Sequence, residues 1–157
     1  MTSSPWSAFR AAEPAFAESV QSRFQQYGHH VLATLRSDGS PRLSGLEVNF
    51  RFGELWLGMM PSSRKARDLL RDPRFALHTN PGADDATDAG DARISGRAHE
   101  VTEPGRKRRF ADDVQPPEPF HLFRVGIGEV VRTSVEGDEL VVRSWSPGAP
   151  LRTRRRR

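Results

Sequence analysis

The sequence contains no cysteine, which excludes disulfide bonds, thiolate nucleophiles and cysteine-based metal sites. Long hydrophobic runs are also missing, since no apolar stretch approaches the roughly 20 residues that a membrane-spanning helix needs. The first residues, Met1 to Trp6, include neither the basic segment nor the apolar segment of a secretory signal. We therefore expect a cytoplasmic protein without membrane contact.

Lysine is scarce, because only Lys65 and Lys107 occur among the 24 basic residues. The net charge of +4 would suit a nucleic-acid-binding protein, but five of the arginines lie within residues 152–157. Removing those five leaves −1, so the rest of the chain is nearly neutral. We interpret residues 1–150 as a single domain and residues 151–157 as an arginine-rich, disordered tail. Aromatic residues do not alternate with the basic ones, so we do not expect a nucleic-acid partner.

Short apolar runs separated by turn residues predict a mainly β fold with a few helices. Phe16, Val20 and Phe24 are spaced to share one face of a helix over residues 13–27. Tight turns between successive strands impose antiparallel pairing, and six or so such strands favour a closed or nearly closed barrel. The strands are expected at residues 30–36, 42–50, 54–59, 74–79, 92–101, 120–136 and 139–145, with short helices at 64–71 and within 103–115, and an exposed loop at 81–91.

The start of the short helix at residues 64–71 breaks a rule of helix electrostatics. Ser63 is a suitable N-cap residue, but Arg64 and Lys65 occupy the first turn, where the positive end of the helix favours acidic residues. Each misplaced cation costs about 0.3–1 kcal/mol at an exposed helix end. A bound anion would resolve the conflict, because backbone N–H groups, a hydroxyl and two cations would converge on it. The alternative is that both cations are simply solvated.

Two segments resemble the pyridoxamine 5'-phosphate oxidase-like superfamily. The first is the run Ser63-Arg64-Lys65-Ala66, placed between a strand and a short helix that ends at Asp72-Pro73-Arg74. The second is the strand-turn-strand over residues 33–42. The block over residues 64–74 is most similar to the actinobacterial flavin- and deazaflavin-dependent oxidoreductases of that superfamily. The similarity covers residues 31–79, about a third of the chain, and is only topological over 92–145.

This resemblance implies a six- to seven-stranded antiparallel split β-barrel of the Greek-key type, working as a homodimer with cofactor sites at its interface. It implies an oxidoreductase that binds the phosphate of FMN or coenzyme F-420 and exchanges hydride with an unidentified small molecule. The ring would lie against the second and third strands. Trp145 would either cover the ring or pack in the protein. The cofactor-binding candidates are Ser63, Arg64, Lys65, Met59, Met60, Arg42 and Trp145.

The sequence also departs from the oxidase pattern. The second strand, residues 42–50, lacks the Arg-x-x-Leu-Leu-Lys run, and Arg143-Ser144-Trp145 replaces the Arg-x-His substrate motif. Vitamin B6 oxidation is therefore not expected. The lost strand motif favours F-420, whereas the intact Ser-Arg-Lys run favours FMN, so both stay open. We assign no catalytic side chain and no metal site. The alternative function is a non-catalytic protein that binds a cofactor, haem or another tetrapyrrole.

Overall fold

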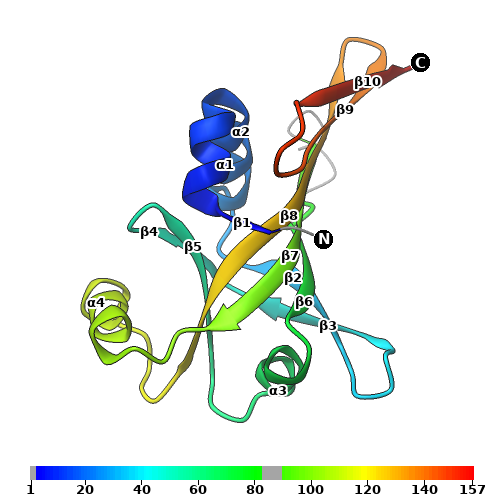
Figure 1. Cartoon of the computed structure of the whole chain (residues 1–157). Coiled ribbons are helices and arrows are strands. Elements are labelled where there is room, and N and C mark those ends of the chain that lie inside the picture. The colour runs from blue at the N-terminus through cyan, green and yellow to red at the C-terminus, as the bar shows by residue number, and fades with distance from the viewer. Residues whose placement is uncertain (1–2, 83–89) are drawn as a thin grey trace.

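The computed structural model describes residues 3–82 and 90–157, and this part of the chain contains ten strands and four helices. Strand makes up the larger share, as the sequence predicts (Figure 1). The strands are β1 (Ser4–Pro5), β2 (His30–Leu35), β3 (Pro41–Leu46), β4 (Val48–Arg51), β5 (Glu54–Met59), β6 (Arg74–His78), β7 (Asp91–Glu100), β8 (His121–Glu136), β9 (Glu139–Trp145) and β10 (Arg152–Arg156). The helices are α1 (Trp6–Ala12), α2 (Pro14–Gln25), α3 (Arg64–Arg71) and α4 (Pro104–Val114).

The strands form one antiparallel sheet whose longest path is β10-β9-β8-β7-β6-β2-β3. The 16-residue strand β8 organises the sheet. One of its edges pairs with β7, while the other pairs in succession with β5, β1 and β9. The sheet thus divides at β8 into two branches and curls without closing (Figure 1). This is a split β-barrel, as expected, with more strands than expected because short β1 and β10 join it and residues 42–50 contribute to two strands.

The strand expected over residues 42–50 is in fact two strands. Its first half, β3, pairs with β2, and its second half, β4, pairs with β5. Glu47 separates the two halves, because the chain changes neighbours there and leaves one sheet branch for the other. Helix α1 was not expected. Its Trp6 and Phe9 are buried and hold it against the barrel.

Residues 152–156 form strand β10, contrary to the disordered tail expected from the sequence. The strand pairs with β9 from Arg152 opposite Ser144 to Arg156 opposite Leu140. Repulsion between its cations is reduced because Arg155 forms ion pairs with Glu136 (3.0 Å) and Glu139 (3.3 Å) on the neighbouring strands. Glu136 and Glu139 lie well before residues 152–157 in the sequence. The arginine-rich segment taken by itself therefore predicted disorder.

Most of the loop expected over residues 81–91 lies outside the described residues, and Asp91 already belongs to β7. The main core fills the barrel and joins α1 and α2 to it through residues such as Phe9, Leu57, Phe123 and Trp145. A second apolar cluster, including Trp56 and Phe110, attaches α4 to the other face of β5 and β8. Among the helices described, none is both long and apolar enough to cross a bilayer.

Candidate functional site

The first turn of α3 has the arrangement that its sequence predicts. Ser63 is the N-cap, and its Oγ accepts a hydrogen bond from the backbone N of Ala66 at 3.3 Å. The first backbone hydrogen bond of the helix runs from Arg67 N to Ser63 O at 3.1 Å. The N–H groups of Arg64 and Lys65 therefore come before the helical ladder begins, and the first turn has no acidic residue. These donors suit an anion.

Lys65 is a cation held partly out of water. Its Nζ donates a hydrogen bond to the backbone O of Gly45 at 2.8 Å, which ties α3 to β3. Burial lowers the pKa of Lys65 below the ordinary 10.5, because the charged form loses hydration. Within the described part of the chain, no carboxylate forms an ion pair with it. The positive charge of Lys65 therefore has no carboxylate partner among the described residues.

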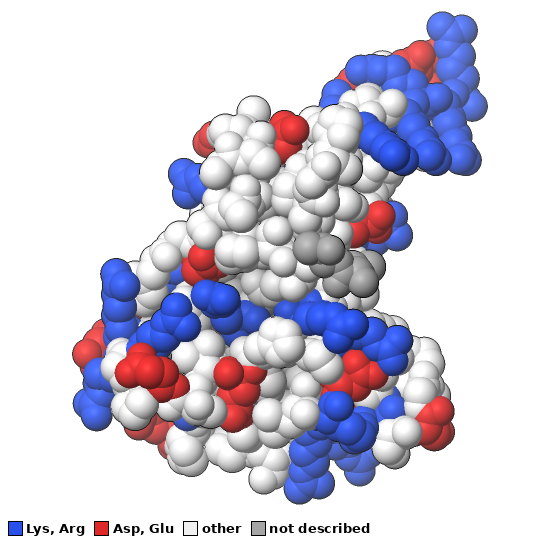
Figure 2. Space-filling model, in the orientation of Figure 1, with Lys and Arg blue, Asp and Glu red and all other residues white. Residues whose placement is uncertain are grey.

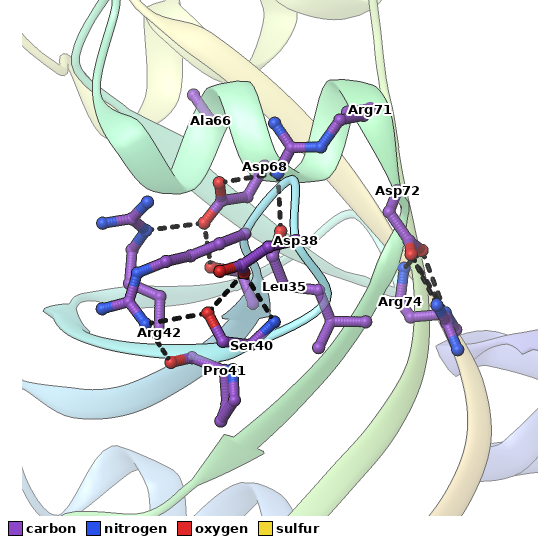
Figure 3. Close-up of polar contacts among 12 residues, drawn as sticks. Leu35, Asp38, Ser40, Pro41, Arg42, Ala66, Asp68, Arg71, Asp72 and Arg74 are labelled. Atoms are coloured by element: carbon purple, nitrogen blue, oxygen red, sulfur yellow. Dashed lines mark hydrogen bonds and ion pairs between the residues drawn. The ribbon is translucent and has the colours of Figure 1, made fainter.

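Asp68, one turn further along α3, is the buried centre of a polar network (Figure 3). Its Oδ2 accepts hydrogen bonds from Thr34 Oγ1 at 2.8 Å and from Arg42 Nε at 2.7 Å. Its Oδ1 accepts one from Arg71 Nη2 at 3.0 Å. Burial alone would raise the pKa of Asp68, but the hydrogen bonds from Arg42, Thr34 and Arg71 outweigh it and lower the pKa. Asp68 is thus held in its charged form near neutral pH, and it fixes α3 against β2 and β3.

An arginine-lined groove of about 330 Å³ lies between this network and the turn joining β2 to β3. Arg42 and Arg71 are engaged by Asp68, and Arg36 donates to Pro41 O at 2.7 Å. Arg64 and Arg67 form no ion pair with any described residue, so they are available to an added anion. The groove is lined by Arg36, Ser37, Asp38, Arg42, Arg64, Arg67, Asp68 and Arg71.

A second hollow, of about 260 Å³, opens beside the end of β5. Met59 and Met60 both line it, and Met59 belongs to the main core with 3% of its surface exposed, whereas Met60 is 75% exposed. Polar groups are supplied by Glu47 and Asn49. The walls are completed by α4 and the segment after it, through Phe110, Val114, Gln115, Pro116, Pro117 and Phe120. The hollow is mainly apolar with a few polar groups, as small-molecule sites commonly are.

The predicted site residues thus fall into two neighbouring regions and one outlier. Ser63, Arg64 and Lys65 share the start of α3, and Arg42 lies in the arginine-lined groove with Arg64. Met59 and Met60 line the second hollow, which begins at the strand leading into that helix. Trp145 lies elsewhere. It is 5% exposed and packs on Phe9 with ring centroids 4.8 Å apart, so it has the packing role.

Sequence reasoning missed Asp68 and its partners Thr34 and Arg71. One signal was present, because Arg64, Arg67 and Arg71 are spaced to share one face of a helix, with Asp68 beside them. A single acidic residue on a helix face of arginines indicates that its carboxylate forms ion pairs with some of them. Among the described residues no cluster of three metal-ligating side chains occurs.

Comparison with known proteins places this geometry in a family. The family model of pyridoxamine 5'-phosphate oxidase matches residues 16–133. Searching the curated proteins finds no match. Several solved structures share the fold. PhzG from Burkholderia lata, in complex with tetrahydrophenazine-1-carboxylic acid, is 14% identical with a TM-score of 0.63, over 98% of this chain and 93% of that one.

Two further structures show the same likeness. A conserved hypothetical protein from Mycobacterium tuberculosis is 24% identical with a TM-score of 0.57, over 88% of each chain. A putative pyridoxamine 5'-phosphate oxidase from Listeria innocua is 13% identical with a TM-score of 0.60, over 72% of this chain and 94% of that one. At such identities these structures support the fold alone. The family model spans most of the sequence, and the chain therefore belongs to the pyridoxamine 5'-phosphate oxidase family.

Proposed function

We propose that this protein is an oxidoreductase that binds FMN or F-420 by its phosphate at the start of α3 and exchanges hydride with a small molecule. The observation that carries the proposal is the set of donors at that turn. Unpaired backbone N–H groups, the cations of Arg64 and Lys65, and the hydroxyl of Ser63 gather where the helix favours negative charge. Family membership supports the same cofactor class, because members commonly bind flavins such as FMN.

The charges present fit a phosphate. Lys65 is partly buried without a carboxylate among the described residues, and Arg64 and Arg67 are similarly free of ion pairs. A phosphate would compensate these cations, and a guanidinium can donate two parallel hydrogen bonds to it. Asp68 does not compete for the phosphate, because Thr34, Arg42 and Arg71 already donate to its two oxygens. Its role would be to hold the site rigid.

The hollow beside Met59 and Met60 would take the ring or the substrate. Its apolar walls would exclude water from the reacting face, while Glu47 and Asn49 would orient a polar edge by hydrogen bonds. The flavin or deazaflavin supplies the hydride chemistry when it is bound. The protein then supplies position and exclusion of water, so that no side chain needs to act as acid or base.

A homodimer is part of the proposal, supported by the outer face of the sheet. Leu43 is 73% exposed there, beside a hollow of about 270 Å³ with a largely apolar lining. Val31, Ala33, Ala76 and Val131 contribute to that lining from β2, β6 and β8. The lining also includes His78, Arg93 and Glu129, and a mostly apolar surface of this kind suits burial against a second copy.

The test is a titration of the purified protein with FMN and, separately, with F-420, followed by fluorescence. We expect micromolar or tighter binding of one of them. The double variant Arg64→Glu with Lys65→Glu should weaken it at least about 100-fold, because two charge-assisted contacts become repulsive. The matched control is Arg106→Glu with Arg108→Glu, which makes the same charge change on exposed residues of α4 and should bind normally.

The outcomes separate the alternatives. Binding of neither cofactor would contradict the proposal. Equal weakening by both double variants would show that net charge, not the turn at Ser63, governs binding. Tight binding without hydride exchange in a screen of small-molecule acceptors, using the matching reductant, would favour the non-catalytic alternative.

A further inference from the structure

The last strands of the sheet form an arm that extends away from the barrel (Figure 1). We call it the arginine arm, and it consists of residues 131–136 of β8, strand β9, and residues 152–157 with strand β10. Figure 2 shows Lys and Arg side chains gathered at this end of the molecule. Since the rest of the chain is nearly neutral, the arm concentrates the positive charge of the protein. Neither the barrel nor the proposed cofactor site explains it.

Strand alternation sorts the arginines of the arm onto two faces. On the face that continues the barrel interior, three of the four arginines lie near carboxylates, and the fourth, Arg132, donates to the backbone O of Asp91 at 3.0 Å and of Thr133 at 3.2 Å. Arg155 pairs with Glu136 at 3.0 Å, and Arg143 pairs with the same carboxylate at 3.0 Å. Arg157 lies 4.0 Å from carboxylate oxygens of both Asp138 and Glu139. This face is close to neutral, and its ion pairs stabilise the pairing of β10.

On the opposite face of the arm, the arginines have no carboxylate partners among the described residues. Arg152, Arg154 and Arg156 all point to it, and all three are exposed. Their cross-strand neighbours on β9 are Ser144, Val142 and Leu140, none of which carries charge. No described residue forms an ion pair with the three arginines. They make a row of free guanidinium groups whose Cα atoms are about 6.8 Å apart along the strand.

A row of guanidinium groups favours a ligand that carries a series of phosphate groups. A guanidinium binds a phosphodiester through a planar fork of donors, and a regular row of them matches a ligand with repeated anionic groups. Duplex DNA presents such repeated charges at high density along its two backbones. Single strands are held mainly by aromatic stacking, and the one aromatic residue of the arm, Trp145, is 5% exposed and packs on Phe9. Duplex DNA is therefore favoured over single strands.

We propose that the row of Arg152, Arg154 and Arg156 binds the phosphate backbone of duplex DNA without sequence preference. The sequence predicted no nucleic-acid partner, because aromatic residues do not alternate with the basic ones, and it predicted a disordered tail. The structure instead orders it and neutralises only one face. Half or more of the hydrogen bonds between proteins and DNA go to the sugar-phosphate backbone, and three exposed guanidinium groups in a regular row suit its repeated charges, so we assign the contacts to phosphates.

The experiment measures binding of the full-length protein to a labelled, mixed-sequence DNA duplex of about 20 base pairs by fluorescence anisotropy over a series of salt concentrations. If three phosphates are neutralised, log K should fall with log salt with a slope of about −2.7, or about 40-fold between 50 and 200 mM. The triple variant Arg152→Gln, Arg154→Gln, Arg156→Gln should lose this binding and its salt dependence. Unlabelled RNA duplex and single-stranded DNA serve as competitors.

The matched control is Arg10→Gln, Arg106→Gln, Arg108→Gln, which removes the same charge from exposed helical positions. It should keep the binding. Equal loss in both triple variants would overturn the proposal in favour of net charge alone. Unchanged binding in the arm variant would also overturn it, as would arm-dependent binding of vesicles containing anionic lipid without binding of duplex.

A structural role for the row makes a different prediction. β10 is an edge strand, and charged side chains on an edge strand prevent association with other sheets in many proteins. The alternative is that the row has this role and no other. In that case the arm variant would self-associate in gel filtration, and the wild-type protein would not bind duplex. That result would overturn the proposal, whereas a variant of unchanged size that has lost duplex binding supports it.

Discussion

The Nε of Arg42 donates a hydrogen bond to the Oδ2 of Asp68 at 2.7 Å, and this contact joins β3 to α3 across the proposed phosphate site. The side chain of Asp68 is 3% exposed and that of Arg42 is 18% exposed, so the pair is shielded from water. Thr34 and Arg71 complete the hydrogen bonding of the carboxylate. The position of α3 thus depends on a buried charge with all its partners in place.

The first prediction concerns Asp68→Asn. The change removes the negative charge and replaces one acceptor oxygen by a donor, leaving Arg42 or Arg71 without its acceptor. The free energy of unfolding should fall by about 3 kcal/mol, as is typical when one partner of a buried ion pair is removed. Urea unfolding followed by circular dichroism measures it.

Asp72→Asn is the matched control, one turn further along the chain. Asp72 also pairs with an arginine, Arg74, at 2.7 Å, but that arginine is 61% exposed. Solvent screens such a pair, so the control should lose much less stability. Equal losses in the two variants would show that burial does not determine the strength of the Asp68 network.

The second prediction is the pH dependence of the same network. Because the pKa of Asp68 is lowered on folding, its contribution to stability is complete above the pKa of an unfolded aspartate, near 3.8. The contribution is lost as the pH falls through the lower folded pKa. The difference in unfolding free energy between wild type and Asp68→Asn should therefore be constant near neutral pH and shrink below about pH 4.

Unfolding curves recorded between about pH 7 and pH 3 test this. Other carboxylates with lowered pKa values, such as Asp72 and Glu136, change wild type and variant alike, so they cancel in the difference. A difference that grows on acidification would contradict the assigned direction of the pKa shift.

Features set by residues close together in the chain were predictable from the sequence. The N-cap at Ser63 depends on the residues that follow it, and the hairpin between β8 and β9 depends on the turn at Gly137. Asp68 was missed because its partners Thr34 and Arg42 are 34 and 26 residues away. Only the folded barrel brings them together.

Two other predictions, the single strand over residues 42–50 and the disordered tail, were wrong for the same reason. Alternation of apolar residues over 42–50 is compatible with one strand, and the exchange of partners at Glu47 depends on β2 and β5. The order of β10 depends on Glu136 and Glu139, which offset its charge from neighbouring strands. In each case the deciding interaction is non-local.

The third prediction concerns Gly96, which lies at an irregularity in the pairing of β7 with β8. A Cβ at this position would overlap the carbonyl O of Gly126 and lie 2.8 Å from the N of Gly128. Both atoms belong to the backbone and cannot move aside without disturbing β8. Gly96→Ala should therefore lower the unfolding free energy by at least about 2 kcal/mol.

Gly58→Ala is the control, because Gly58 also lies within a strand but a Cβ there meets nothing within 4 Å. Thermal unfolding of the two variants should show a large loss for Gly96→Ala and little change for Gly58→Ala. A small effect at Gly96 would mean that the two strands can separate locally at low cost.

The fourth prediction links the charge of Lys65 to cofactor affinity. Burial lowers the pKa of Lys65 in the free protein, whereas a bound phosphate would favour its charged form and raise the pKa. The affinity for FMN or F-420 should therefore fall as the pH rises through the pKa of Lys65 in the free protein. Lys65→Arg keeps a positive charge at alkaline pH, so its affinity should depend less on pH.

The ratio of the two Kd values, measured by fluorescence titration from neutral to alkaline pH, isolates the contribution of Lys65. Ionisation of the cofactor itself affects both proteins equally and cancels in this ratio. Lys65→Gln should bind weakly at every pH, because the hydrogen bond to Gly45 and the charge are both changed. A constant ratio would show that Lys65 does not contact the phosphate, and would leave Arg64 and Arg67 as the cations that bind it.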